Sequence, residues 1–149
     1  MAFLNISTKN KKGVLADIDR QDYFRLSNST SSRLTLYNFA FALGFNNGLP
    51  SELDGPKESL IREEYVKDQP RRFMYSAAYF AAHETDCMGN LEKITSSDNV
   101  FPLADKYANT GFNVLSDFMK KYDDKALALK LIADMDEMNA KFLADFGEQ

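Results

Sequence analysis

Residues 123–147, with the sequence DDKALALKLIADMDEMNAKFLADFG, decide the fold class of this chain. Large apolar side chains recur here at steps of four, four, three, four and four residues: Leu127, Leu131, Met135, Met138, Phe142 and Phe146. This spacing predicts an amphipathic α-helix, which Asp123 or Asp124 is expected to cap and Gly147 to end. The acidic residues expected on its solvated side are Asp134, Asp136 and Glu137.

A second amphipathic pattern precedes this helix and begins near Pro102. Its apolar stripe, once a glycine is allowed a place in it, consists of Leu103, Tyr107, Gly111, Val114, Phe118 and Tyr122. Because the connection between the two helices is short, they are expected to pack as antiparallel neighbours. Residues 96–149 are therefore predicted to form a helical hairpin.

The first two thirds of the chain contain two more predicted helices. Residues 33–45 follow a Ser/Thr cluster suited to capping and precede Asn46-Asn47-Gly48, a suitable stop. They are apolar on almost every side, so this helix is expected to be central and covered on every side, by its own domain or by a partner. Another helix is expected from Gln69 to about Met88, because Asp68-Gln69-Pro70 combines an acidic cap with a proline in the first turn.

The remaining segments are less regular. Residues 1–21 are predicted to form an extended N-terminal arm with a short strand, and residues 22–27 are a second strand candidate. Residues 57–66 fit either a helix or a strand. We expect a single domain over residues 1–149, mainly α, with four to five helices and one short N-terminal strand or strand pair. Its three parts are the arm, an arginine-bearing helical part over 22–95, and the hairpin.

Length and composition narrow the class of protein. The chain has 149 residues, of which 44% are apolar and 27% charged, the balance of a globular domain. A single cysteine excludes a disulfide framework, and no run of apolar residues reaches the length of a membrane span. The first lysines follow the apolar residues at the N-terminus, which is the reverse of a secretory signal. We therefore expect a cytoplasmic protein that does not enter a membrane.

Charge is distributed unevenly along the chain. Residues 1–75 carry eleven Lys and Arg against nine Asp and Glu, a net of +2, whereas residues 76–149 carry seven against thirteen, a net of -6. All six arginines lie between positions 20 and 72. Because the guanidinium group suits carboxylates, phosphates and base edges, five of them are candidate contacts for a partner protein or DNA: Arg25, Arg33, Arg62, Arg71 and Arg72. The alternative is that the arginines pair with the acidic second half inside the fold.

Few residues here suit catalysis. His83 and Cys87 are the only histidine and cysteine, and they stand four residues apart on one face of a predicted helix. Such a pair supplies two metal ligands, but a stable site needs three or four, so both residues are expected to be structural and no metal is predicted. The sequence contains no phosphate loop, dinucleotide motif or nucleophile elbow. We therefore predict no cofactor, nucleotide cofactors included, and no enzymatic activity.

The sequence predicts a strand followed directly by a capped helix at residues 22–33, the order in which ribbon-helix-helix proteins present side chains to DNA. This region, over residues 24–66, resembles the DndE family of accessory proteins of bacterial DNA phosphorothioation. The motifs that carry the resemblance are Arg25-Leu26-Ser27, Arg33-Leu34, Ala40-Phe41-Ala42-Leu43, Asp54-Gly55-Pro56-Lys57-Glu58 and Ile61-Arg62-Glu63-Glu64-Tyr65. This sequence lacks the turn that splits the family's helical region, and its C-terminal 70 residues have no counterpart in the family. No binding residue carries over individually. The resemblance implies a place in a bacterial or phage DNA-modification or defence system.

Two functions from different classes follow from these patterns. The first is a non-enzymatic helical accessory or adaptor protein that acts through protein-protein or DNA contacts. Its arginine-bearing half is expected to engage the partner or DNA, and its helical hairpin to give stability or self-association. The second is a small metal-binding helical bundle or enzyme centred on His83 and Cys87. The scarcity of histidine and cysteine favours the first.

Overall fold

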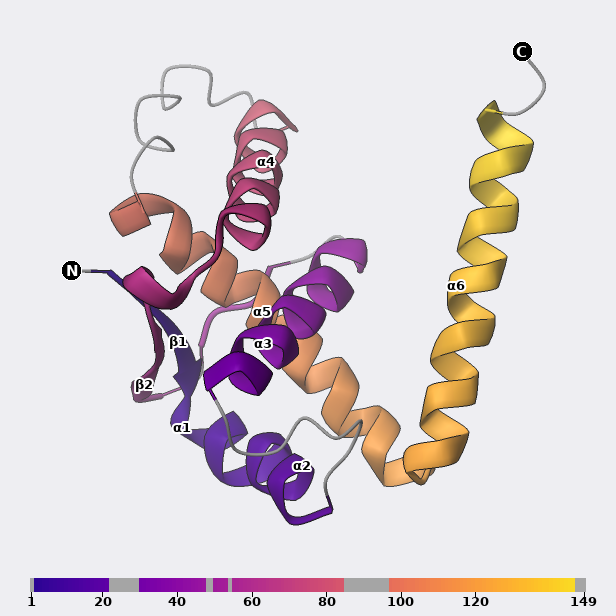
Figure 1. The fold of residues 1–149 in the computed structure, drawn as a ribbon, viewed down its shortest axis with the longest axis horizontal. Helices are drawn as coiled ribbons and strands as arrows, with labels where there is room; N and C mark the ends of the chain where they lie inside the picture. Colours follow the sequence, from indigo (N-terminus) through magenta and orange to yellow (C-terminus); the bar gives the residue numbers. More distant parts are fainter. Residues whose placement is uncertain (1, 22–29, 48–49, 54, 85–96, 147–149) are drawn as a thin grey trace. The chain divides into compact units, whose positions relative to one another are not determined.

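The computed structural model describes residues 2–21, 30–47, 50–53, 55–84 and 97–146 (Figure 1). The chain divides into two compact units, Met1–Ser116 and Asp117–Gln149. This boundary lies inside a long helix and not at residue 95, where the sequence suggested that the hairpin begins. The fold is mainly α, as predicted.

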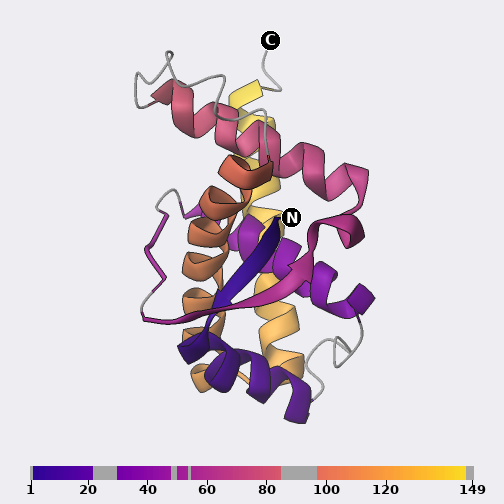
Figure 2. The same cartoon turned by 90° about the vertical axis from the view of Figure 1, so that its left-hand side faces the viewer.

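A two-stranded antiparallel sheet joins the start of the chain to its middle (Figure 2). Strand β1 (Phe3–Ser7) pairs with β2 (Lys57–Arg62), so that Phe3 lies opposite Arg62 and Ser7 opposite Lys57. The segment 57–66, which the sequence left undecided, is therefore a strand that continues into the 3-10 turn η3 (Glu63–Tyr65). The strand predicted at residues 22–27 lies outside the described residues.

Residues 8–21 are helical, so the prediction of an extended arm over residues 1–21 is wrong beyond Ser7. Helix α1 (Thr8–Asn10), the π-helical turn η1 (Lys11–Leu15) and α2 (Ala16–Gln21) follow one another directly. The Ser7 hydroxyl accepts a hydrogen bond from the Asn10 amide at 3.1 Å and caps the first turn. The apolar residues buried along this segment are Val14, Leu15 and Ile18.

The predicted helix over residues 33–45 is present as α3 (Thr30–Asn46). Leu36, Tyr37 and Ala40 are completely buried on one side, whereas Thr35 and Ala42 on the other side are exposed. Within this chain α3 is thus covered on one side, and coverage of its other side by a partner stays a prediction. The buried side chains of α3 occupy about one half of the circumference of the helix.

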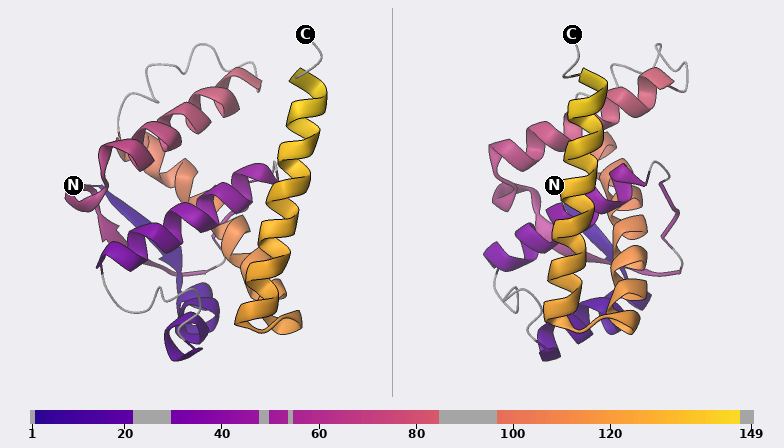
Figure 3. Two further views of the ribbon diagram at one scale, coloured as in Figure 1. Left: turned by 45° about the vertical axis from the view of Figure 1, so that its right-hand side comes forward. Right: turned by 90° about the vertical axis from the view of Figure 1, so that its right-hand side faces the viewer.

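Helix α3 crosses α5 (Ser97–Lys121) with the two backbones in contact (Figures 1 and 3). A Cβ atom at Gly44 would lie 1.7 Å from the Tyr107 carbonyl oxygen, and one at Gly111 would lie 1.6 Å from the Ala40 carbonyl oxygen. No side chain fits at either position, so the two glycines permit the crossing. An edge-to-face contact of Phe41 with Tyr107, at 6.0 Å between ring centroids, packs beside it.

Helix α5 differs from its predicted start, whereas α4 (Asp68–Glu84) can be compared with its prediction only at its start. Helix α4 starts at the predicted acidic cap, and residues 85–96, where it was expected to end, are outside the described residues. Helix α5 begins at Ser97, with Pro102 inside it, and not at Pro102. Its buried face also differs from the predicted stripe, because Phe101, Ala108 and Phe112 are buried while Leu103 and Val114 are only partly so.

The second unit contains the end of α5 and helix α6 (Asp124–Phe146). Asp123 caps α6 as predicted, since its Oδ1 accepts a hydrogen bond from the Ala126 amide at 2.8 Å. Only Tyr122 and Asp123 join the two helices. The antiparallel hairpin stays a prediction. None of the helices in the described part of the chain has both the length and the apolar character of a membrane span.

Candidate functional site

Two of the five candidate arginines, both partly buried, form ion pairs inside the first unit, and a third, Arg62, makes an exposed pair. Arg33, with a side chain only 16% exposed, forms an ion pair with Asp19. Arg71 donates to the Glu63 carboxylate at 3.4 Å and to the Glu63 carbonyl oxygen at 2.9 Å. These acidic partners lie in the N-terminal half, not in the acidic second half that the alternative interpretation proposed.

The other candidate arginines are differently placed. Arg62, at the end of β2, is exposed and lies 3.7 Å from the exposed Glu64 carboxylate. Arg72 is exposed on the first turns of α4. Arg25 is outside the described residues. Arg71 thus lies near the end of β2, since it bonds to Glu63, the residue after Arg62, whereas Arg33 lies on α3. Contact of these arginines with a partner stays a prediction.

A buried carboxylate that the sequence analysis did not single out connects three elements of the first unit. Asp105 of α5 is 3% exposed. Its Oδ1 accepts hydrogen bonds from the Tyr37 hydroxyl of α3 at 2.7 Å and from the Asn5 amide of β1 at 2.8 Å. Its Oδ2 accepts from the Asn5 side chain at 3.1 Å. The sequence did contain a signal, because Asp105 falls between Phe101, Ala108 and Phe112 on the helical wheel.

Burial changes the acid-base properties of this group. Loss of water raises the pKa of Asp105 from 3.8 to about 6, because the hydrogen bonds from Asn5 and Tyr37 and the positive charge of Lys57 compensate only in part. Burial, together with the charge of Asp105, raises the pKa of Tyr37 well above its ordinary range. Asp105 can thus exchange a proton near neutral pH.

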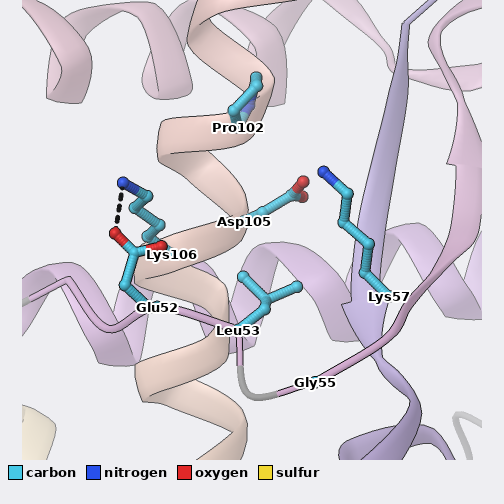
Figure 4. A pocket seen from close by; sticks show the side chains of 7 residues that line it. All are labelled: Glu52, Leu53, Gly55, Lys57, Pro102, Asp105 and Lys106. Atoms are coloured by element: carbon cyan, nitrogen blue, oxygen red, sulfur yellow. Dashed lines mark ion pairs between the residues drawn. The ribbon is translucent and has the colours of Figure 1, made fainter.

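Asp105 forms one wall of a pocket of about 190 Å³ (Figure 4). The Lys57 side chain extends toward the carboxylate from the β2 side, and Leu53 and Pro102 supply apolar walls (Figure 4). On the other side, Lys106 pairs with Glu52 at 2.7 Å. Each carboxylate in the lining thus has a partner within the protein, which is typical of a network that stabilises a fold.

A second polar network lies one helical turn further along α5. Asn109 accepts a hydrogen bond from the Asn10 side chain at 2.8 Å and donates to the Glu52 carbonyl oxygen at 3.1 Å. It also donates to the Ser51 hydroxyl at 3.0 Å. These contacts hold the segment that contains Ser51 and Glu52, a wall of the pocket, against α5.

Four of the six large apolar side chains that the described residues expose lie on α6, in the second unit. We call these four the α6 apolar surface; its members, with their exposed fractions, are Leu129 (60%), Ile132 (56%), Met135 (65%) and Leu143 (57%). Leu127, on the same helix, is buried. Soluble proteins rarely leave such a run of large apolar side chains uncovered unless it binds something.

The charged side of α6 is neutralised within the helix. Lys130 pairs with Asp134 at 2.8 Å and Lys141 pairs with Glu137 at 3.3 Å, each one turn apart. Lys130 also lies 5.1 Å from the centre of the Phe118 ring. Apolar contact therefore dominates what the rest of this helix offers to a partner.

The alternative metal site cannot be assembled from the described residues. His83 lies near the end of α4, and Cys87 lies outside the described residues. Within the parts of the chain that the structure describes, no group of three His, Cys, Asp or Glu side chains could hold a metal ion. The proposed pairing of His83 with Cys87 stays a prediction.

No family model, curated protein or solved structure matches this chain. The resemblance of residues 24–66 to the DndE family therefore stays a prediction made from its motifs.

Proposed function

We propose that this protein is a non-enzymatic accessory or adaptor protein that acts by binding another protein chain through the α6 apolar surface. The observation that carries the proposal is the exposure of Leu129, Ile132, Met135 and Leu143 along one helix, each by more than half. Large apolar side chains on a helix are a common means of recognition between proteins, because they exchange contact with water for contact with a partner.

The size of the second unit supports the proposal. A unit as short as Asp117–Gln149 cannot bury enough apolar surface by itself to offset the loss of conformational freedom. Isolated helices are only marginally stable in water, and most helical stability comes from covering an amphipathic face. A partner that covers the α6 apolar surface would supply that stability.

Protein contact is favoured over DNA contact by the state of the arginines. Arg33 and Arg71 already make ion pairs inside the first unit, and the candidate arginines that are exposed, Arg62 and Arg72, lie on different elements. DNA binding depends on several cations that contact phosphates together. The net charge of -6 over residues 76–149 also disfavours nucleic acid near α6.

Site-specific photo-crosslinking in the producing cells tests the proposal. A benzoylphenylalanine at position 129 or 132 is expected to give protein adducts, because these side chains lie at the proposed contact. The matched control is the same residue at position 137, where Glu137 is 68% exposed on the charged side of the same helix. Adducts from 129 and 132 but not from 137 would support the proposal. Absence of adducts at 129 and 132, or equal adducts at all three positions, would contradict it.

A further inference from the structure

We infer that the α6 apolar surface binds a second copy of this chain, with the two α6 helices antiparallel. The contact is made by four exposed residues that we call the α6 strip: Lys125, Leu129, Ile132 and Asp136. Lys125 of one copy lies opposite Asp136 of the other, and Leu129 of one copy opposite Ile132 of the other. This inference rests on the proposed function and specifies its partner.

The spacing of the α6 strip permits this pairing. Its members follow one another at steps of four, three and four residues, so they lie on one side of the helix. The order of the steps is the same in both directions. A two-fold axis through the midpoint between Leu129 and Ile132 therefore brings the strip of one helix onto the strip of an antiparallel copy, as an isologous contact requires.

The charges of the α6 strip select the antiparallel direction. The basic residue is at the N-terminal end of the strip and the acidic residue at its C-terminal end. An antiparallel copy places each lysine opposite an aspartate, twice per dimer, whereas a parallel copy would place lysine opposite lysine and aspartate opposite aspartate. Opposite charges flanking an apolar centre are the usual determinant of orientation between paired helices.

Four neighbouring charged side chains that the structure describes on α6 are paired with one another and do not compete for this contact. Lys130 and Asp134 are paired with each other, as are Lys141 and Glu137, on the charged side of the helix. The strip is therefore complementary to itself, both in shape and in charge. This complementarity identifies a second copy, and not an unrelated helix, as the partner.

A charge-exchange experiment tests the inference with the full-length chain. Lys125→Glu makes the strip acidic at both ends, and Asp136→Lys makes it basic at both ends. Each variant alone replaces two attractive pairs by two repulsive ones and is expected to weaken self-association roughly tenfold at low salt. An equimolar mixture of the two variants restores opposite charges at both ends, so it is expected to form heterodimers with the affinity of the wild type.

The matched control is Lys141→Glu, which makes the same change of charge on the charged side of α6 and should leave self-association unchanged. Sedimentation velocity measures all five samples, namely the wild type, the two single variants, their mixture and the control. Circular dichroism verifies that each variant is folded. Weakened single variants and a restored mixture would support the inference. A wild type that stays monomeric, or a mixture that associates no better than its components, would overturn it.

The crosslinking experiment separates this inference from the proposed function. Adducts of position 129 with a second copy of the chain support both. Adducts only with a different protein overturn the inference and leave the proposed function standing. No adducts overturn both.

Discussion

Replacing Asp105 by asparagine is expected to change the way in which stability depends on pH. The carboxylate is 3% exposed, and burial raises its pKa from 3.8 to about 6. In the unfolded chain, where it meets water, the group regains its ordinary pKa. Between these two values the folded chain holds the proton more firmly than the unfolded chain does. The contribution of Asp105 to the free energy of unfolding therefore falls as the pH rises.

The size of the effect follows from the shift in pKa. About two pKa units correspond to about 3 kcal/mol, at about 1.36 kcal/mol per unit. This contribution is fully present below pH 3.8 and is lost as the pH rises through 6. Asparagine cannot ionise, and its amide oxygen can still accept a hydrogen bond from the Tyr37 hydroxyl. The variant should therefore lack the loss that the wild type suffers.

The assay is urea unfolding at several pH values between 4 and 7, followed by circular dichroism. The quantity of interest is the difference in unfolding free energy between wild type and Asp105→Asn. Taking the difference cancels the contributions of other carboxylates to the unfolding free energy. Hydrogen bonds lower the pKa values of Glu58 and Glu63, for example, so their stabilising contributions are lost as the pH falls. The wild type should lose about 2 kcal/mol relative to the variant between pH 4 and pH 7, because part of the full contribution is already lost at pH 4.

Asp117→Asn is the matched control, because it removes a carboxylate whose side chain is 73% exposed. It is expected to follow the wild type within about 1 kcal/mol at every pH. A difference between wild type and Asp105→Asn that does not change with pH would refute the reasoning, since it would mean that Asp105 titrates alike in both states.

Two further substitutions test the packing and the arginines. Gly111→Ala should abolish the cooperative transition in a thermal melt, because the new Cβ would lie 1.6 Å from the Ala40 carbonyl oxygen. The control is Gly13→Ala, where a Cβ has no atom within 4 Å, and this variant should melt at or above the temperature of the wild type. Arg71→Ala should lower the unfolding free energy by about 1 kcal/mol through loss of its hydrogen bonds inside the fold, while the exposed Arg72→Ala should change it by less than about 0.5 kcal/mol. Equal stabilities of the two arginine variants would show that the Arg71 contacts do not form in solution.

Local sequence patterns predicted those elements that local interactions determine. The start of α6 at Asp123 was predictable because a capping carboxylate lies within three residues of the amide that it serves. Helix α3 was predictable from its length and its flanking stops. Its exposed side was not, because the extent of covering depends on which other elements pack against it, as at the crossing of Gly44 with Tyr107.

The structure contains three features that the sequence did not predict, and each has its own physical reason. Residues 57–62 form a strand because β1 pairs with them, and no pattern within 57–66 itself records this partner. The helical segment over residues 8–21 was missed although Ser7 was an available cap, because a three-residue α-helix continued by a π-helical turn has no regular period. Asp105 was missed because the stripe predicted for its helix was centred on a different side.

The sequence predicted one apolar side of α6 but not the α6 apolar surface itself. The regular stripe from Leu127 to Phe146 was recognised, and self-association was expected of the hairpin. Leu129 and Ile132 were not part of that stripe, because a helix with two adjacent apolar sides has no single period that includes both. Their exposed fractions of 60% and 56% in the structure distinguish the second side.

Sedimentation equilibrium of the full-length chain tests the central claim most directly, namely that the α6 apolar surface binds a second copy. The wild type is compared with Leu129→Ser/Ile132→Ser over a wide range of concentration. The mass of the wild type should rise from the 16.9 kDa of one chain toward twice that value, while the double variant should stay at 16.9 kDa and keep its helical circular dichroism. A wild type that remains at 16.9 kDa throughout, or a double variant that associates as strongly as the wild type, would contradict the claim.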